Sequence, residues 1–203
     1  MSVSEPASTS RPVSSPSISV IIPTLNEASR IAELITSTRQ IGDCEIVVVD
    51  GGSTDGTRER AALADVVLES ERGRAKQQNL GVEFSHGEIL LFLHADCRLS
   101  DGAFEAIRFS MLDERTVGGC FEQRIDADGW MYRWLERGNA WRVRWFGMAY
   151  GDQGIFIRRS VFEELGRFED VKLMEDVLLM KRLRRRGRFV LLNDRITVSP
   201  RRW

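Results

Sequence analysis

The sequence predicts one α/β domain, built on a mostly parallel central sheet with helices on its faces. Short apolar runs alternate with segments whose apolar residues recur at helical spacing, which is the pattern of βαβ units. The run at 44–50 is apolar on both faces, as expected of a buried parallel strand. The chain has 203 residues, enough for one substantial core and too few for two independent domains.

The first half contains the clearest alternation of strands and helices. A β-branched run predicts a strand that Pro23 ends, and Asn26 with Glu27 then opens a helix. The predicted elements in order are strand 18–23, a helix from 26, strand 44–50, helix 55–63, strand 66–69, helix 74–84 and strand 89–93.

The second half is less regular, and no internal repeat is found in it. The predicted elements are helix 101–113, strand 117–125, an aromatic-rich helix at 129–146, strand 154–157 with a helix after it, a basic helix at 175–186 and strand 188–192.

The N-terminal segment 1–17 contains seven Ser and three of the five Pro, so we expect a disordered tail with order beginning at Ile18. It lacks the basic-then-apolar pattern of a signal peptide. No apolar run reaches the roughly 18 residues that span a bilayer. The three cysteines form no CxxC pair, which favours a reducing compartment and a cytoplasmic location.

The charge is unevenly distributed along the chain. The formal net charge of −1 gives no reason to expect a nucleic-acid partner. From Arg158 onward, however, Lys and Arg exceed Asp and Glu by 6. A basic C-terminal region is compatible with an anionic ligand or an anionic membrane surface.

Acidic residues stand where two predicted strands end, and parallel sheets bind ligands at that edge. Asp50 begins a Gly-Gly-Ser-Thr-Asp-Gly turn, which either contacts a nucleobase or ribose or is only a capped tight turn. His94-Ala95-Asp96 ends the buried strand predicted at 89–93. It offers a carboxylate to Mg²⁺ or Mn²⁺, or else a capping Asp beside a packed His.

Three further segments carry candidate chemistry. The cations of the 71–79 segment open a helix, where they would suit a diphosphate or form a solvated helix start. Glu175 and Asp176 begin another helix, either as complements to its dipole or with one of them as a general base. The turn at 150–154, with Asp152 and Gln153, is either a floor for a sugar or a simple loop.

Four tryptophans fall within 16 residues of the helix at 129–146, at spacings that place them on one face. Core packing is the commonest role of such a stripe. A stacking platform for an acceptor and an interfacial segment on anionic lipid are the alternatives. Arginines are interleaved with the tryptophans, and in sequence order these residues are Trp130, Arg133, Trp134, Arg137, Trp141, Arg142, Arg144 and Trp145.

In this order, these motifs resemble glycosyltransferase family 2, the inverting GT-A group that uses nucleotide-sugar donors. The resemblance covers nearly all of 18–203 and implies a GT-A fold, a single Rossmann-like domain. It further implies a nucleotide-binding half at about 18–100 and an acceptor half at about 101–203. The segments YGDQGIF and LMEDV are most similar to those of a small bacterial subgroup often labelled with arsenosugar biosynthesis. The matching segments are 19–27, 48–57, 72–79, 93–96, 151–154 and 174–176.

The resemblance implies a role for each matching residue. Asp96 corresponds to the metal-binding carboxylate of the DXD motif, holding Mn²⁺ or Mg²⁺, and Asp176 to the catalytic base with Glu175 as its supporting neighbour. Arg74 and Lys76 approach the diphosphate of a nucleotide-sugar donor, most simply a UDP-sugar. The remaining donor-binding residues are Pro23, Thr24, Glu27, Asp50, Ser53, His94, Ala95, Asp152 and Gln153.

The chain also departs from the family pattern. His94 replaces the first Asp of DXD, which puts one metal ligand in doubt. Two alternative functions therefore stay open: a nucleotide-sugar-binding protein without turnover, and a methyltransferase that uses S-adenosylmethionine. The second would leave Asp96 and Asp176 without a role. The acceptor is not identified, and contact of 129–146 with a membrane remains a hypothesis.

Overall fold

A computed structural model describes residues 15–171 and 173–200. Residues 1–14 of the tail predicted at 1–17 and the C-terminal residues 201–203 lie outside this range. In chain order the elements are β1 Ile18–Thr24, α1 Ile31–Ile41, β2 Glu45–Asp50, α2 Thr57–Arg60, η1 Ala61–Leu63, β3 Val66–Glu69, α3 Arg74–Glu83, β4 Ile89–Phe92, β5 Cys97–Leu99, α4 Ala103–Ser110, β6 Thr116–Ile125, α5 Trp130–Phe146, η2 Gly151–Gln153, β7 Ile155–Arg158, α6 Arg159–Glu164, α7 Glu175–Leu183 and β8 Arg188–Val198.

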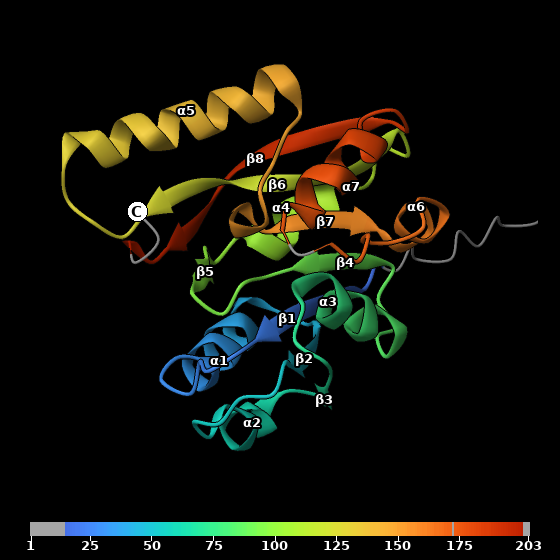
Figure 1. Ribbon diagram of the computed structural model, residues 1–203. Coiled ribbons are helices and arrows are strands. Elements are labelled where there is room, and N and C mark those ends of the chain that lie inside the picture. Colours follow the sequence, from blue (N-terminus) through green and yellow to red (C-terminus); the bar gives the residue numbers. More distant parts are fainter. Residues whose placement is uncertain (1–14, 172, 201–203) are drawn as a thin grey trace, which may run out of the picture.

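The described strands form one eight-stranded sheet in the order β3-β2-β1-β4-β7-β6-β8-β5. Four of its seven pairings are parallel, among them the continuous run β3-β2-β1-β4. The β4–β7, β6–β7 and β5–β8 pairings are antiparallel. The predicted α/β class with a mostly parallel sheet is therefore confirmed (Figure 1).

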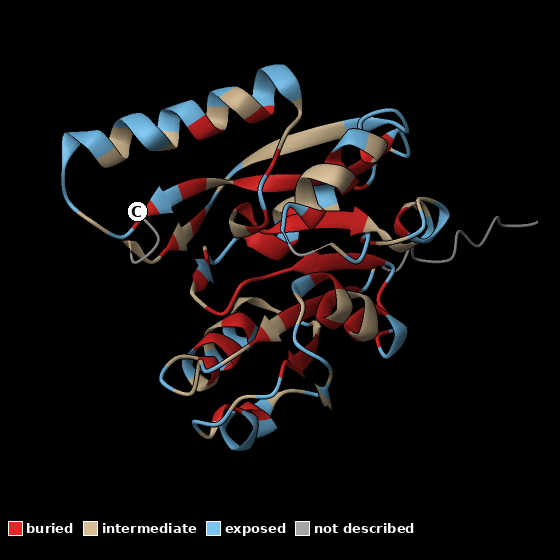
Figure 2. Ribbon diagram, viewed as in Figure 1, coloured by how far each residue is buried: buried red, intermediate tan, exposed pale blue. Residues whose placement is uncertain are grey.

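Burial on both faces explains why the central strands are apolar throughout. Along β2, Ile46 and Val48 pack against one core, whereas Val47 and Val49 pack against the other. Helices α1 and α4 cover the first face, and α3, α6 and α7 cover the second. Figure 2 shows the central strands mostly red with burial, β8 mostly tan and the outer helix surfaces pale blue.

The first helix begins later than the sequence predicted, at Ile31 and not at 26. Asn26 adopts a left-handed backbone with φ of 55°. The amide of Glu27 donates to the Thr57 hydroxyl at 2.9 Å, and that of Ala28 donates to the Asp55 carboxylate at 3.1 Å. These amides bind the loop after β2, which holds the two loops together and delays the helix.

The C-terminal strand is longer than predicted, because it has partners on both sides. β8 runs beside β6 and also pairs with β5, a short strand that the sequence did not predict. Its register with β6 shifts between Phe121 and Glu122, where Asn193 and Asp194 lie opposite no partner residue. Polar residues at these positions do not fit the pattern of a strand, so the sequence predicted that the strand ends before them. In the structure a bulge accommodates them and the strand continues.

Ordered structure extends one residue before the expected start at Ile18. The carbonyl of Ser17 accepts a hydrogen bond from Ile89 at 3.0 Å, and its hydroxyl accepts one from Glu88 at 3.1 Å. Ser17, directly before β1, therefore bonds to the residues at the start of β4, although the sequence assigned it to the tail.

Candidate functional site

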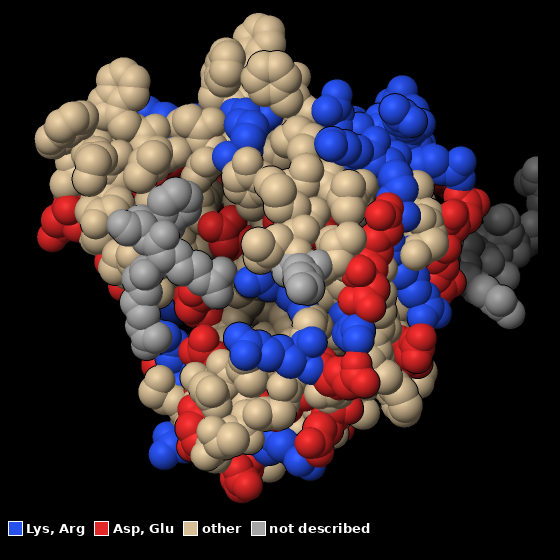
Figure 3. Space-filling view, viewed as in Figure 1, with Lys and Arg blue, Asp and Glu red and all other residues tan. Residues whose placement is uncertain are grey.

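A cleft of about 820 Å³ opens where β1 and β4 end side by side. Figure 3 shows a hollow in the middle of this face with Lys and Arg side chains at its rim. The cleft gathers residues from four separate segments of the chain. They are Pro23, Thr24, Leu25, Glu27, Arg72, Gly73, Arg74, Lys76, Gln77, His94, Ala95, Asp170, Val171, Leu173 and Glu175.

The end of β1 forms one wall of the cleft. Thr24 is buried, and its hydroxyl lies 3.3 Å from a carboxylate oxygen of Asp50. Gln77, on α3, donates to the carbonyls of Thr24 and Val49 at 2.9 and 2.8 Å. This buried amide ties α3 to the ends of β1 and β2, so the wall is rigid.

Asp50 is fully buried at the end of β2, and its carboxylate is turned into its own loop. It accepts hydrogen bonds from the amides of Gly52 and Ser53 at 3.0 and 2.7 Å, and from the Ser53 hydroxyl. The Ser53 hydroxyl in turn accepts from the amide of Asn26 at 2.8 Å. In this geometry Asp50 and Ser53 shape the loop, and neither lines the cleft.

Cations from the start of α3 form the second wall. Lys76 donates to Glu71 at 2.6 Å and lies 3.7 Å from Asp170. The hydrogen bond to Glu71 raises the pKa of Lys76, and the same contact lowers the pKa of Glu71. Arg74 lies 3.3 Å from Glu175, which is 97% buried. Arg72 also lines the cleft.

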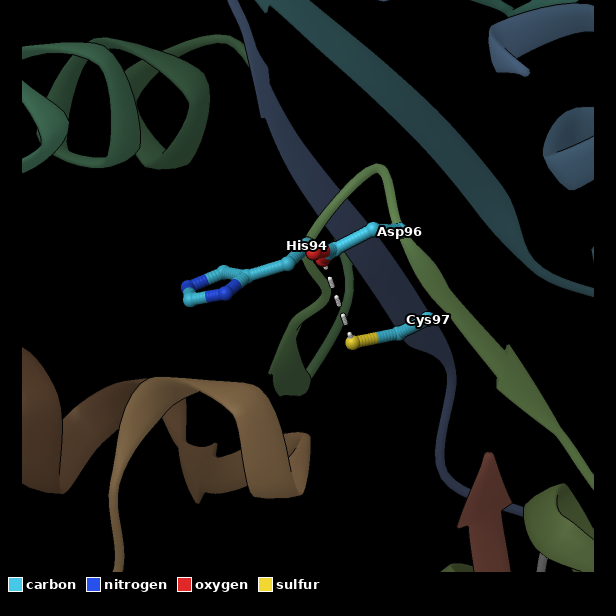
Figure 4. A group of neighbouring side chains, drawn as sticks. All are labelled: His94, Asp96 and Cys97. Atoms are coloured by element: carbon cyan, nitrogen blue, oxygen red, sulfur yellow. Dashed lines mark hydrogen bonds between the residues drawn. The ribbon is translucent and has the colours of Figure 1, made fainter. Parts of the chain in front are cut away.

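The turn after β4 holds three potential metal ligands. Ligand atoms of His94, Asp96 and Cys97 lie within 4.8 Å of one another. Figure 4 shows the imidazole and the carboxylate extending from this turn, with the Cys97 thiol beside the carboxylate. His94 and Ala95 line the main cleft, whereas Asp96 lines an adjoining cleft that also includes Ala95. The turn therefore lies between two openings.

A carboxylate and an imidazole suit a divalent cation that completes its shell with oxygens from a diphosphate. The thiol of Cys97 is a soft donor, which neither Mg²⁺ nor Mn²⁺ prefers. The donor set thus fits a cation held mainly by Asp96, with His94 as a nitrogen ligand.

The two carboxylates that begin α7 point in different directions, as expected of neighbours on a helix. Glu175 lines the cleft beside Arg74. Asp176 instead accepts hydrogen bonds from the amides of Gly151 and Val177, both at 2.7 Å. A Cβ built on Gly151 would lie 2.8 Å from Nε2 of His94 and 3.6 Å from Asp176. Asp176 and His94 therefore approach each other across Gly151.

A network of polar side chains holds the 150–153 turn in place. Arg142 of α5 donates to the side chains of Asn139 and Gln153 at 2.8 and 2.9 Å, and its guanidinium lies 3.8 Å from the centre of the Tyr150 ring. Gln123 donates to the Asp152 carboxylate at 2.8 Å. Gln153 is fully buried, so it supports the turn from below and is not part of its surface.

The tryptophans of α5 are exposed, so their expected role in core packing is wrong. Trp130, Trp134, Trp141 and Trp145 are 56% to 76% exposed, and the buried residues of the helix are Asn139 and Val143. Polar contacts such as that of Arg142 attach the helix to the domain, which leaves its aromatic face outward.

Sequence reasoning missed several residues that line the cleft. Arg72 belongs to the cationic segment 71–79, so its position near Arg74 in the sequence could have indicated that it lines the cleft. Gln77 occupies the same motif, but only the fold reveals that its amide joins two strands. Asp170 and Leu173 come from the loop before α7, where no pattern marks them.

The sequence of this domain matches a known protein family. The family model described as "Glycosyl transferase family 2" matches residues 19–166, which is more than half of the chain. The chain belongs to glycosyl transferase family 2. This membership agrees with the order of motifs from β1 to η2 and makes the described domain a glycosyltransferase domain.

Family 2 relatives include the glycosyltransferase AglJ of Haloferax volcanii, 40% identical over 104 residues that cover 50% of this chain and 33% of the relative. A PGL/p-HBAD biosynthesis glycosyltransferase of Mycobacterium bovis is 31% identical over 164 residues, covering 76% of this chain and 64% of the relative. The chain thus spans about a third to just under two thirds of the length of these relatives.

The fold of this family 2 domain is similar to that of S. aureus TarS, residues 1–349. The structure of TarS in complex with UDP-GlcNAc superimposes with a TM-score of 0.70 at 18% identity, over 91% of this chain and 59% of TarS. The GT-A fold expected from the sequence is therefore confirmed.

Proposed function

We propose that this chain transfers a sugar from a nucleoside diphosphate sugar, a UDP-sugar in the simplest case, to an acceptor hydroxyl with inversion at the anomeric carbon. The observation that carries the proposal is the cleft at the ends of β1 and β4, which combines a rigid polar wall, three cations and a buried carboxylate. The carboxyl ends of parallel strands are where such sheets bind nucleotides.

The donor would lie across the two walls of the cleft. Pro23, Thr24 and Glu27 would contact the base and ribose, within a loop that Asp50 and Ser53 hold in shape. Arg74 and Lys76, with Arg72 beside them, would face the diphosphate, since guanidinium and ammonium groups bind phosphate oxygens strongly.

Asp96 would hold a divalent cation, Mn²⁺ or Mg²⁺, with His94 as a further ligand. When bound, the cation would neutralise charge that develops on the departing nucleoside diphosphate. Ala95, which stands between these two ligands in the sequence, would line both the main cleft and the adjoining cleft.

Asp176 would act as the catalytic base. Its carboxylate is held by two backbone amides, and within the described residues no cation lies within 4.0 Å of it. It would take the proton of the acceptor hydroxyl as the new glycosidic bond forms and the bond to the diphosphate breaks. Glu175 is paired with Arg74 and would support the site from that position. Asp152 would form the floor beneath the sugar, on a turn that the buried Gln153 supports from below.

Relatives and structural neighbours support this proposal. AglJ and the mycobacterial relative are named glycosyltransferases, and TarS has been solved with UDP and with UDP-GlcNAc. Membership in family 2 leaves methyl transfer without support. The narrower resemblance to the arsenosugar subgroup, the division into halves near residue 100 and the cytoplasmic location stay predictions.

Equilibrium binding and transfer assays together test the proposal. We expect UDP to bind more tightly with Mn²⁺ than without it, S-adenosylmethionine not to bind, and a panel of UDP-, GDP- and dTDP-sugars to identify the donor. Asp96→Asn should abolish the effect of Mn²⁺ on UDP binding and keep the fold. Binding of S-adenosylmethionine in place of UDP would overturn the proposal. UDP binding with equal donor hydrolysis by wild type, Asp96→Asn and Asp176→Asn would indicate a protein without turnover.

A further inference from the structure

Helix α5 has an unusual distribution of side chains for the outermost helix of a globular domain. Its exposed face carries four tryptophans, and Met131 and Phe146 beside them are 57% and 52% exposed. At 3.6 residues per turn, the four tryptophans lie within an arc of about 60°. Helices at a protein surface normally direct such residues inward, so this one presents its apolar side to the surroundings.

The aromatic face is ordered by contacts within itself. The rings of Trp141 and Trp145 lie 6.0 Å apart, and Trp141 meets Phe146 edge to face at 5.7 Å. On the opposite side, Arg133 donates to the carbonyls of Ile125 and Ala127 at 2.8 and 2.9 Å. The helix is therefore fixed to the domain by polar bonds together with the buried Val143, and its four tryptophans contribute little to the core.

A cluster of exposed cations adjoins the C-terminal end of α5. A Cβ on Gly147 would lie 3.3 Å from the side chain of Arg184, so α5 ends against α7. Figure 3 shows the cluster as a blue region at the upper right, next to the tan side chains along the top of the view. The cluster comprises Lys181, Arg184, Arg185, Arg186 and Arg188, all exposed.

Most of this positive charge is not neutralised by the protein. Arg186 pairs with Glu164, and Arg188 lies 3.5 Å from Asp113. For Lys181, Arg184 and Arg185, the described part of the chain provides no carboxylate within 4.0 Å. Arg137 on α5 is likewise exposed and stands between the tryptophans.

From this juxtaposition we propose that α5 and the cationic cluster at 181–188 form one docking surface for an anionic lipid bilayer. Tryptophan settles at the boundary between headgroups and acyl chains, where its ring is in an apolar environment and its N–H reaches water. Adjacent Lys and Arg add attraction to anionic headgroups. A second copy of the chain would bring two cationic clusters towards each other, which disfavours self-association through this surface.

The proposed surface is separate from the donor cleft and does not depend on the proposed glycosyl transfer. In Figure 3 the hollow faces the viewer, whereas the aromatic row lies along the upper edge. A domain docked through that edge would keep its donor cleft open to water.

Sedimentation of the full chain with vesicles tests the docking surface. We expect binding to vesicles of phosphatidylcholine mixed with phosphatidylglycerol, weaker binding to phosphatidylcholine alone, and a further decrease as salt is raised. The triple variant Trp134→Ser/Trp141→Ser/Trp145→Ser should lower the partition coefficient by about tenfold or more. Arg184→Glu/Arg185→Glu should remove the preference for phosphatidylglycerol.

The matched control is Phe109→Ser/Leu112→Ser, which removes exposed apolar side chains at and after the end of α4, 78% and 66% exposed. It should bind vesicles as wild type does, and circular dichroism should show every variant folded. Equal sedimentation of wild type and the tryptophan variant would overturn the proposal. So would a wild-type dimer that the tryptophan substitutions dissociate, because the occupant would then be a second copy.

Discussion

The backbone amide of Gly151 donates a 2.7 Å hydrogen bond to Oδ2 of Asp176. The amide of Val177 binds the other oxygen of this carboxylate at the same distance. Two elements that are distant in sequence, η2 and α7, thus fix one carboxylate beside His94. Both donors are neutral, and within the described residues no Lys or Arg lies within 4.0 Å of this carboxylate.

Replacement of Asp176 by Asn is expected to remove the base and leave the cleft intact. Transfer should fall by about 10²- to 10⁴-fold, which is the usual contribution of a general base. The Kd for UDP should stay within about twofold of wild type, since Asp176 does not line the cleft. Glu175→Gln is the comparison: unlike an exposed partner, the buried Glu175 holds Arg74 in place at the cleft, so its loss should weaken donor binding. Full activity of Asp176→Asn would exclude it as the base.

Gly151→Ala should reduce transfer through a steric effect. The new methyl group would lie 2.8 Å from Nε2 of His94, closer than real Cβ atoms approach, so His94 or the 150–153 turn must move. We expect lower kcat together with weaker Mn²⁺ dependence. Gly138→Ala is the matched control, because its Cβ would meet no atom within 4 Å and Ala favours a helix by about 1 kcal/mol. Equal kcat values for the two variants would show that the turn does not position Asp176.

The central sheet and the cleft residues differ in how far the sequence could predict them. Continuous apolar runs such as Val47–Val49 are sufficient to place buried strands, and their acidic ends indicate where a ligand binds. The direction of a side chain is decided by tertiary contacts. The bonds of Asp50 to Gly52 and Ser53 are local, and the sequence left such a capped turn open as an alternative. Nothing local, in contrast, shows that Glu175 and not Asp176 lines the cleft.

The tryptophan stripe shows that the sequence also could not predict which side of α5 faces the domain. Helical spacing placed the four rings on one face correctly, but spacing does not show which face meets the domain. Here Arg142 and Asn139 take the inner side, because the buried amides of Gln123 and Gln153 require polar partners there. A polar inner face is visible only once these strands and turns are placed.

Arg142 is expected to contribute to both stability and activity. Its guanidinium binds Met148, Asn139 and Gln153, and Arg142→Gln would leave the buried oxygen of Gln153 without its charged donor. Hydrogen bonds to charged groups contribute about 1.5–3 kcal/mol, so urea denaturation should show a loss of about 2 kcal/mol. Arg142→Lys should recover only part of this, since an ammonium cannot reproduce the three-way geometry. A lower kcat at unchanged KM for the donor would identify Arg142 as a positioning residue; unchanged kcat would limit its role to stability.

The pairing of Lys76 with Glu71 predicts how donor binding varies with pH. The hydrogen bond from Lys76 raises its own pKa above the ordinary lysine value, so the ammonium stays charged below that value and loses its proton only at higher pH. The Kd for UDP should therefore show no dependence on Lys76 between about pH 7 and pH 9. Lys76→Met should weaken binding equally across this range.

If Lys76 binds the diphosphate as proposed, Glu71 would compete with the diphosphate for that ammonium. Glu71 is 81% exposed, so water screens its ion pair with Lys76 and the pair is weak. Glu71→Gln should therefore tighten UDP binding by about two- to threefold, measured by titration calorimetry at constant pH. Glu69→Gln is the control, because its partner Arg58 does not line the cleft. Weaker UDP binding in Glu71→Gln would show that Glu71 holds Lys76 in its binding position, because removal of a competitor alone could only strengthen binding.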